Sequence, residues 1–329
     1  MKLDHLVATF ALVASVAFDP LIASEGSYSI ALVPKGPDRE VWDSIHAGAL
    51  KAKQELGEEG IDVEVLWRGS AVGKPREQQI QVVDSFTGQR LSGILAASMN
   101  EEDLAEMATV RGDGNIPMIQ LNRALDSEQP ISFVALDNYQ GGALAADRIS
   151  QLIRGEGSVI LMKSGMSDIN AEAREAGFRE TIRKNHPSIR IIAAEEPKGT
   201  SYRAAYEKSE SLLNRYGRRV DAIFVSDEMA TGAFIDALRD FQLAGQVSLV
   251  GYNANEKSLA SIRNGDAQGL IVSDPFRMGY LGVRSLIDHL KGVPSSTIVD
   301  SGLVLVTDAN IDSDAVVALL NPPVAEYLK

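Results

Sequence analysis

The sequence predicts an α/β protein made of two similar lobes, each built on a parallel sheet. Two observations carry this prediction. From residue 28 onward, short runs rich in β-branched residues alternate with amphipathic stretches, which is the pattern of a doubly wound parallel sheet. The same spacing of these elements then occurs twice along the 329 residues. That length is enough for two domains, and a content of 45% apolar and 23% charged residues is typical of a globular protein.

The first 24 residues differ in composition from all that follows. Lys2 precedes the apolar run LVATFALVASVAF, and the small residues Ala23 and Ser24 come after it. A charged start, an apolar middle and small residues at the end are typical of a secretory signal peptide, with cleavage expected near Ser24. The alternatives are a buried N-terminal helix or a membrane anchor, although this run is shorter than the roughly 20 residues that a spanning helix needs.

Five strands are expected in each half of the remaining chain. They lie at 28–34, 62–67, 93–97, 117–121 and 132–136 in the first half, and at 157–163, 189–194, 221–225, 247–252 and 268–272 in the second. Helices fit between them at 39–56, 73–89, 101–113, 139–154, 171–185, 201–215, 228–241, 255–264 and 276–291. In the first helix, Val41, Ile45, Ala49 and Ala52 fall on one face at a spacing close to 3.6 residues, as expected for a helix that covers a sheet.

The intervals between these elements repeat from one half to the other. Ile30 precedes Gly48 by 18 residues, and Ile160 precedes Gly177 by 17. The intervals Ile30–Ile94 and Ile160–Ile223 are 64 and 63 residues, and Ile94–Ile119 and Ile223–Leu249 are 25 and 26. Three matching intervals in series indicate two copies of one α/β unit.

Two such units side by side place the carboxyl ends of both sheets on a shared cleft, where open α/β sheets bind their ligands. Polar loops are expected there: VPKGPDREVW, AASMNEED, QLNRALD, KSGMSDINAEAR, VSDEMAT, GYNANE and VSDPFRMG. Exposure to solvent alone would also explain why these loops are polar. Their convergence on one cleft is what makes them candidates for a binding site.

Several segments, in this order, resemble the periplasmic sugar-binding proteins of the ribose-binding type, which supply ABC importers. The segments are YSIALVPKG, REQQIQVVDSFTGQRLSGILAAS, NIPMIQLNR, FVALDNYQGGALAA, AREAGF, AIFVSDEMATGAFIDAL, LVGYN and DPFRMGYLGV. The resemblance implies two Rossmann-like lobes joined by a hinge of three crossing segments. We expect a signal peptide at 1–24, an N-terminal lobe of 25–136 plus 274–302, and a C-terminal lobe of 137–273 plus 303–329.

The resemblance also implies a set of ligand contacts, carried over position by position. In the family, the loop after the first strand stacks aromatic rings on the sugar, and polar side chains from the other loops bind its hydroxyl groups. The matching positions here are Lys35, Arg39, Trp42, Ser98, Asn122, Arg123, Arg174, Ser226, Asp227, Asn253 and Ser273.

Two features of this set differ from the family pattern. Asn122 and Asn253 stand where the family commonly has aspartate, and Lys35 adds a cation. A carboxylate repels an anion whereas an amide beside cations tolerates one, so the site would accept an acidic or phosphorylated sugar more readily. Lys35 pointing into solvent is the alternative.

Two of the implied contacts have competing explanations. Trp42 lies one helical turn before Ile45, so burial against the sheet would explain it as well as stacking on a ligand. Arg174 lies near a helix start, where a cation is slightly unfavourable against the helix dipole, and this favours a role in the site over a surface ion pair. Asp137 and Asn138 are expected to cap a helix rather than bind ligand.

Composition and motifs exclude most other classes of function. The net charge of −13 argues against a nucleic-acid partner. Zero cysteines exclude disulfides, thiolate metal sites and a lipid-modified cysteine, so we expect an exported periplasmic protein without a lipid anchor. The sequence lacks the G-x-S-x-G, H-E-x-x-H and P-loop motifs, and its four histidines are scattered. We therefore expect no enzyme activity, no metal and no cofactor.

The leading hypothesis is a monomeric binding protein that captures a small carbohydrate and delivers it to an ABC importer permease in the inner membrane. A ligand sensor that presents a sugar or sugar acid to a chemoreceptor or sensor kinase is the alternative. The effector core of a repressor of the lactose type is a third, weaker one, because only about 27 residues, mostly apolar, precede the first strand.

Overall fold

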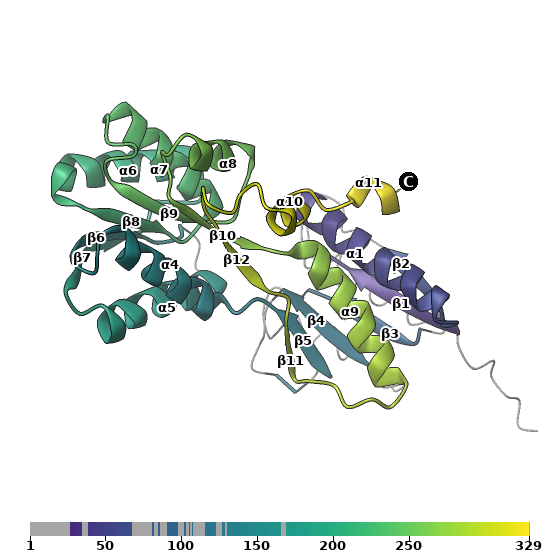
Figure 1. The fold of residues 1–329 in the computed structure, drawn as a ribbon. Helices are drawn as coiled ribbons and strands as arrows, with labels where there is room; N and C mark the ends of the chain where they lie inside the picture. Colours follow the sequence, from purple (N-terminus) through teal and green to yellow (C-terminus); the bar gives the residue numbers. More distant parts are fainter. Residues whose placement is uncertain are drawn as a thin grey trace, which may run out of the picture.

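The computed structural model describes residues 27–34, 39–67, 91–97, 116–122, 130–165 and 169–328, together with positions 81, 85, 102, 105, 107, 127 and 128. It contains two α/β lobes that lie side by side and are joined through their middle by crossing segments (Figure 1). The fold class predicted from the sequence is confirmed.

The N-terminal lobe is built on a sheet of six strands in the order β11-β5-β4-β3-β1-β2. The bounds are β1 (Ser27–Val33), β2 (Asp62–Trp67), β3 (Gly93–Ala96), β4 (Met118–Asn122), β5 (Ser132–Ala135) and β11 (Ile298–Asp300), all paired in parallel. Helices α1 (Arg39–Glu58) and α9 (Pro275–Leu290) pack against each other and bury their apolar sides with the sheet in one core.

The C-terminal lobe repeats this plan with the strand order β12-β10-β9-β8-β6-β7. Its strands are β6 (Gly157–Met162), β7 (Ile189–Glu195), β8 (Ala222–Val225), β9 (Ser248–Tyr252), β10 (Gly269–Ser273) and β12 (Leu303–Val306), of which only β12 pairs antiparallel. Helices α4 (Asn138–Leu152) and α5 (Ile169–Asn185) contribute to one core. Helices α6 (Tyr202–Tyr216), α7 (Glu228–Asp240) and α8 (Glu256–Arg263) contribute to a second core on the other face.

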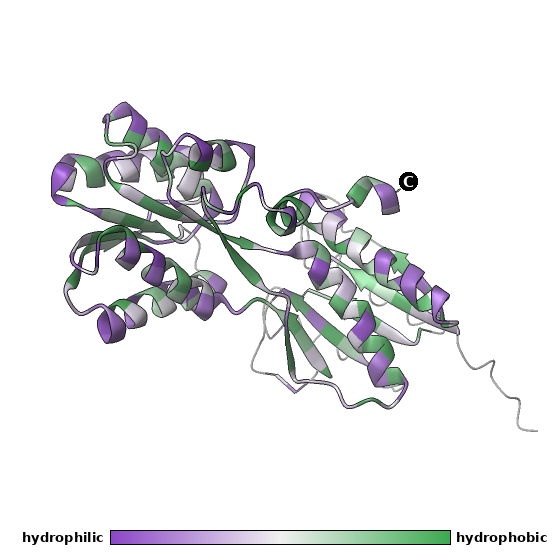
Figure 2. Cartoon of the chain, in the orientation of Figure 1, coloured by the Kyte–Doolittle hydropathy of each residue, from purple (hydrophilic) through white to green (hydrophobic). Residues whose placement is uncertain are grey.

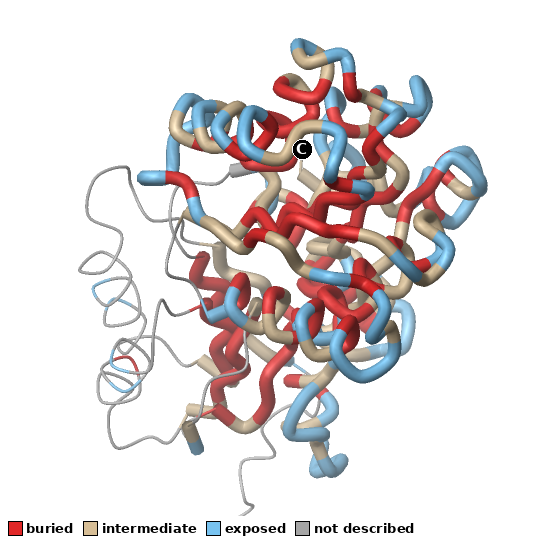
Figure 3. Tube along the Cα trace, turned by 90° about the vertical axis from the view of Figure 1, so that its left-hand side faces the viewer, coloured by how far each residue is buried: buried red, intermediate tan, exposed pale blue. Residues whose placement is uncertain are grey.

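The central strands of both lobes are apolar and buried, whereas the edge strands β2 and β11 carry exposed residues. Figure 2 shows the central strands in green between helices that are purple on their outer sides, and Figure 3 shows them as a red interior. A strand covered by helices on both faces needs apolar residues at successive positions, as in Ala222–Val225 of the C-terminal lobe, every residue of which is buried. The residues of Ile30–Val33 in the N-terminal lobe are buried in the same way.

The predicted elements that fall on described residues match the structure to within two residues at each end. The expected helices at 73–89 and 101–113 and the signal peptide at 1–24 lie outside the described residues. The sequence did not predict four short elements near the end of the chain: β11, β12, α10 (Asp314–Leu320) and α11 (Val324–Tyr327).

Three segments cross between the lobes, and each follows a strand. They join β5 to α4, β10 to α9, and β11 to β12. The chain crosses between the lobes once more after α10, which the sequence analysis did not predict. Helix α10 packs into the core of the C-terminal lobe, but α11 packs on α1, with the Tyr327 ring 6.0 Å from the Phe276 ring. The chain therefore ends on the N-terminal lobe and not within the C-terminal lobe. The prolines at 322 and 323 end α10 before this last crossing.

In the N-terminal lobe, glycines bring the backbones of α1 and α9 into direct contact. A Cβ atom at Gly48 would lie 1.8 Å from the carbonyl oxygen of Phe276, and one at Gly279 would lie 1.8 Å from that of Ile45. No side chain fits at such distances, so this crossing requires glycine on both helices.

In the C-terminal lobe, α4 and α5 cross in the same way. A Cβ atom at Gly142 would lie 1.8 Å from the carbonyl oxygen of Arg174, and one at Gly177 would lie 1.9 Å from that of Tyr139. The glycines that repeat in the sequence thus mark the same helix crossing in both lobes. This crossing fixes the position of Arg174.

Candidate functional site

The C-terminal lobe brings five of the predicted ligand contacts to the carboxyl edge of its sheet. Ser226 and Asp227 follow β8, Asn253 follows β9, Ser273 is the last residue of β10, and Arg174 projects from the second turn of α5. Because these strands are parallel neighbours in the sheet, their carboxyl ends lie together. This edge is the candidate binding face.

Arg174 is the most firmly held of these side chains. Its Nε donates to Asn138 Oδ1 at 2.9 Å, and its Nη1 donates to the carbonyl oxygen of Ser226 at 2.5 Å. The guanidinium carbon lies 3.9 Å from the centre of the Tyr252 ring, which is the distance of a stacked contact. Among the described residues, no carboxylate lies within ion-pair distance of Arg174, and the groups that contact its guanidinium are neutral.

Asn138 and Tyr252 form the support under Arg174. The Tyr252 hydroxyl donates to Asn138 Oδ1 at 3.0 Å, and Asn138 Nδ2 donates to the carbonyl oxygen of Leu136 at 3.3 Å. Both residues are buried, with 1% of Tyr252 and 5% of Asn138 exposed. Burial raises the pKa of Tyr252 to about 12, so its hydroxyl keeps its proton and remains a donor at neutral pH.

Ser226 lies deeper than predicted. Its side chain is fully buried and donates to Glu175 Oε1 at 3.0 Å, so the hydroxyl already has a partner within the lobe. Glu175 also accepts from the backbone N–H of Ser164 at 3.1 Å, which ties the loop after β6 to the loop after β8. It is the carbonyl oxygen of Ser226 that meets Arg174.

Asp227 caps the helix that follows it. Its Oδ1 accepts from the backbone N–H of Ala230 at 3.0 Å. Beside it lies a hollow of about 290 Å³ that the loops after β6, β7 and β8 share, lined in part by Ser164, Thr200 and Met229. The structure thus adds the loop after β7 to the binding face, which the sequence analysis had left out.

Two asparagines end equivalent strands in the two lobes with the same unusual backbone. Asn122 ends β4 with a φ of 76°, and Asn253 follows β9 with a φ of 56°. Asparagine tolerates this left-handed region better than most residues, which explains these amides at strand ends without reference to a ligand. The Asn253 side chain also accepts from the Ser273 hydroxyl at 3.2 Å, next to the second crossing segment.

Trp42 is placed in the core of the N-terminal lobe. It is 4% exposed and packs with the apolar residues of α1 and the sheet, which favours the core explanation over ligand stacking. The reason is its spacing, because Trp42, Ile45 and Ala49 share the sheet-facing side of the helix. Lys35, Ser98 and Arg123 lie outside the described residues, and Arg39 is described only as the first residue of α1.

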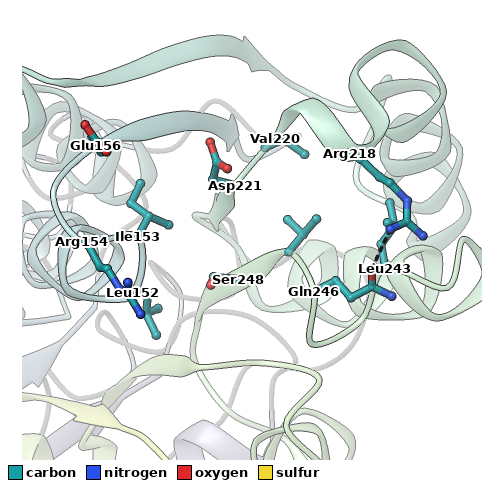
Figure 4. Close-up of a pocket in the computed structure, with 11 residues that line it drawn as sticks. Leu152, Ile153, Arg154, Glu156, Arg218, Val220, Asp221, Leu243, Gln246 and Ser248 are labelled. Atoms are coloured by element: carbon teal, nitrogen blue, oxygen red, sulfur yellow. Dashed lines mark hydrogen bonds between the residues drawn. The ribbon is translucent and has the colours of Figure 1, made fainter.

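Hollows also lie away from the candidate binding face. One of about 440 Å³ lies at the opposite edge of the C-terminal sheet, where β8 and β9 begin (Figure 4). Its polar groups are used structurally: Arg218 donates to Gln246, and Asp221 accepts from the backbone N–H of Ser158. None of the predicted ligand contacts lines it.

Two further searches covered only the part of the chain that the structure describes. No helix there is long and apolar enough to cross a membrane. Nor do three or more histidine, aspartate or glutamate side chains gather there in a way that could hold a metal ion.

Sequence reasoning did not assign Asn138, Tyr252 and Glu175 to the site. Asn138 was expected mainly to start a helix, with a place on the cleft rim as the weaker alternative, and Tyr252 and Glu175 were not singled out. A signal was present, because each is a polar or ionisable group directly beside a predicted contact or a crossing segment. Their roles depend on contacts across 36, 114 and 51 residues of sequence, which periodicity does not reveal.

Comparison with known families gives one match that spans most of the chain. The sequence model of the periplasmic binding protein domain matches residues 30–294. Among curated proteins, the ribose import binding protein of Escherichia coli is 27% identical over 310 residues, covering 92% of this chain and 98% of its own. The xylitol-binding protein of Mycolicibacterium smegmatis is 22% identical, covering 65% of this chain and 62% of its own.

Solved structures share the fold. A carbohydrate transporter solute-binding protein from Agrobacterium radiobacter, in complex with D-arabinose, has a TM-score of 0.72 at 25% identity, covering 91% of this chain and all of its own. The sugar-binding protein of a sugar ABC transporter from Bacillus halodurans has a TM-score of 0.77 at 23% identity, covering 86% of this chain and 99% of its own.

Proposed function

The chain belongs to the periplasmic binding protein family, and we propose that it captures a small carbohydrate between its lobes and delivers it to an ABC importer. The ligand is a monosaccharide, a polyol or a derivative of one. The observation that carries the proposal is Arg174, which projects onto the carboxyl edge of the sheet, is held there by three contacts and has no carboxylate partner among the residues that the structure describes.

Sugar hydroxyl groups require donors and acceptors at fixed positions. The candidate binding face offers donors on Arg174 and an acceptor on Asp227, with Asn253 and Ser273 beside them. Asn122 holds the equivalent strand end in the other lobe, and we propose that it contributes to the same site. Lys35, Arg39, Ser98 and Arg123 complete the set that we propose by family resemblance.

The mechanism is closure of the two lobes around the ligand. Ser273 ends the strand before the second crossing segment, and Asn138 begins the helix after the first, so candidate site residues lie directly at the hinge. A ligand that contacts both lobes stabilises their closed arrangement, which the importer then recognises. Delivery takes place in the periplasm, after removal of residues 1–24, and the protein acts there as a monomer without enzyme activity or nucleic-acid partner.

One observation favours an acidic sugar within this class. The described part of the candidate binding face holds an unpaired Arg174 but an amide at Asn253, where the family commonly has a carboxylate. A cation in a partly desolvated site binds an anion more strongly than a neutral hydroxyl group. A sensor that presents the bound ligand to a chemoreceptor would use the same site, and a cognate permease distinguishes the two roles.

The test is a thermal-shift screen with neutral sugars, polyols and sugar acids side by side, followed by calorimetry on the best ligand. We expect Arg174→Met to raise its Kd by about 30-fold, since a hydrogen bond to a charged group contributes about 2 kcal/mol. Arg179→Met, one turn further along the same helix and exposed, is the control and should leave Kd unchanged. Lys35→Ala should raise Kd for sugar acids only.

Two results would contradict the proposal. A wild-type chain that binds no sugar, polyol or sugar acid in the screen would remove the function itself. Equal Kd values for wild type, Arg174→Met and Arg179→Met would leave the function standing but place the ligand elsewhere.

A further inference from the structure

The two lobes have equivalent positions at their helix crossings, and the contacts identify them. Gly279 of α9 faces the carbonyl oxygen of Ile45, just as Gly142 of α4 faces that of Arg174. Ile45 and Arg174 each also lie three residues before the second glycine of their crossing, at 48 and 177. Arg174 therefore occupies the place that Ile45 holds in the N-terminal lobe.

Asn138 also has an apolar counterpart. Asp274 and Asp137 cap α9 and α4, and the next residue is Pro275 in one lobe and Asn138 in the other.

Tyr252 also has an apolar counterpart in the N-terminal lobe. Strands β4 and β9 hold the same place in their sheets, and each leads to an asparagine with positive φ. The residue before that asparagine is Leu121 in the N-terminal lobe and Tyr252 in the C-terminal lobe.

One lobe thus has Ile45, Pro275 and Leu121 where the other has Arg174, Asn138 and Tyr252. Packing of the crossing helices does not require the polar set, because the N-terminal lobe achieves the same crossing with apolar residues. Burying polar groups costs free energy unless each finds a partner, and here each does. Arg174 is the one residue of the three that is half-exposed. We therefore explain the two buried polar residues by their contacts with Arg174.

We propose that Tyr252 and Asn138 are positioning residues that hold the guanidinium of Arg174 in its binding geometry and link it to the first crossing segment. This inference rests on the proposed function. The Tyr252 ring stacks on the guanidinium. Asn138 Oδ1 accepts from Nε, and the carbonyl oxygen of Ser226 accepts from Nη1. None of the described residues accepts from Nη2, which is therefore the donor that we assign to the ligand, and the side chain is ordered before the ligand arrives.

Asn138 extends the effect to the hinge. It is the first residue of α4 and donates from Nδ2 to Leu136, which lies on the segment that crosses from β5. Movement of that segment and reorientation of Arg174 are therefore coupled through one side chain. The Tyr252 hydroxyl holds this side chain in place by donating to the same oxygen that accepts from Arg174.

Tyr252→Phe tests the role, because it removes the hydroxyl and keeps the ring under the guanidinium. Tyr216→Phe is the matched control, since Tyr216 donates to the carbonyl oxygen of Ile192 in the same lobe. We expect Tyr252→Phe to raise the Kd of the best ligand about fivefold and Tyr216→Phe to leave it within twofold. In the Arg174→Met background, Tyr252→Phe should change Kd by less than twofold, because the group that it positions is gone.

A second measurement needs no ligand. The Arg174 Nε–H, which donates to Asn138, should exchange with water slowly by nitrogen-edited NMR, and Tyr252→Phe should speed this exchange at least fivefold. An unchanged exchange rate, or an equal effect of Tyr252→Phe on Kd with and without Arg174, would overturn the inference. A wild-type chain that binds no sugar would refute only the proposed function, because the exchange rate still decides the positioning role.

Discussion

The two lobes share one backbone design and differ where their side chains meet the carboxyl edges of the sheets. Both cross two helices at glycines, and both end a central strand at an asparagine with positive φ. At the three equivalent positions beside each crossing, the N-terminal lobe is apolar and the C-terminal lobe is polar. The shared part is what the fold needs, and the part that differs shows where the C-terminal lobe carries a site.

The largest loss of stability should come from substitutions at the glycine crossings that the two lobes share. Gly142→Ala places a methyl group 1.8 Å from the carbonyl oxygen of Arg174, which forces α4 and α5 apart. We expect a loss of about 3 kcal/mol or more in the free energy of unfolding, at the upper end of what overpacking costs. Urea unfolding followed by circular dichroism measures it.

Two matched variants decide whether this effect comes from the crossing. Gly279→Ala makes the same clash in the other lobe, 1.8 Å from the carbonyl oxygen of Ile45, and should cost about as much. Gly57→Ala lies in α1 with no atom within 4 Å of its new methyl group, and should stabilise by up to about 1 kcal/mol. Similar losses for all three would show that helical glycines matter here for reasons other than the crossings.

The shared part was largely visible in the sequence, because it depends on spacing. The strands read as apolar runs, and Gly48 and Gly177 recur at nearly equal distances after the first strand of each half. The two-lobed fold follows from these intervals together with the alternation of strand and helix patterns. The short strands β11 and β12, of three and four residues, carry too little periodicity to be predicted.

The polar residues that distinguish the C-terminal lobe could be predicted from the sequence only in part. Arg174 was found because its position matches a family motif, but its supports come from distant segments and their hydrogen bonds depend on three-dimensional packing. At Trp42, residue chemistry and residue spacing suggest different roles. Its chemistry suits ligand stacking, whereas its spacing from Ile45 predicts the buried side of α1, where the structure places it.

An intermediate effect is expected at the next equivalent pair, Glu175 and His46, which directly follow Arg174 and Ile45. Glu175 is 7% exposed and accepts from the Ser226 hydroxyl and the Ser164 N–H. Glu175→Ala removes the acceptor of the buried Ser226 hydroxyl and of the Ser164 N–H, so we expect a loss of about 2 kcal/mol in the free energy of unfolding. The exposed Glu172→Ala on the same helix is the control and should cost less than about 0.5 kcal/mol.

Ligand binding sharpens this second prediction. If Glu175 holds the loop after β8 in place, Glu175→Ala should also weaken binding, because the Ser226 carbonyl that accepts from Arg174 would lose its fixed position. Calorimetry on the best ligand measures the change. Full stability and unchanged affinity together would mean that the buried carboxylate is not needed for either.

His46 occupies the matching place in the N-terminal lobe but is not buried to the same degree. Its ring stacks on Trp67, with centres 4.5 Å apart and planes inclined by 7°. Burial lowers the pKa of His46 below its ordinary value of 6.5, and the nearby Asp43 carboxylate opposes this in part. A neutral imidazole thus fills a place where the other lobe holds a buried carboxylate.

The smallest effect is the pH dependence that follows from His46. Because its pKa is lower in the folded state, the unfolded chain binds more protons once the pH falls below about 6.5. The His46 contribution to stability is therefore complete above that pH and is lost as the pH falls towards the folded-state pKa. His46→Phe keeps a ring against Trp67 but cannot titrate, so its unfolding midpoint should fall less than that of wild type between pH 7.5 and 5.5. Asp43→Asn removes the opposing charge and should steepen the fall, whereas parallel pH profiles for all three proteins would contradict the assignment.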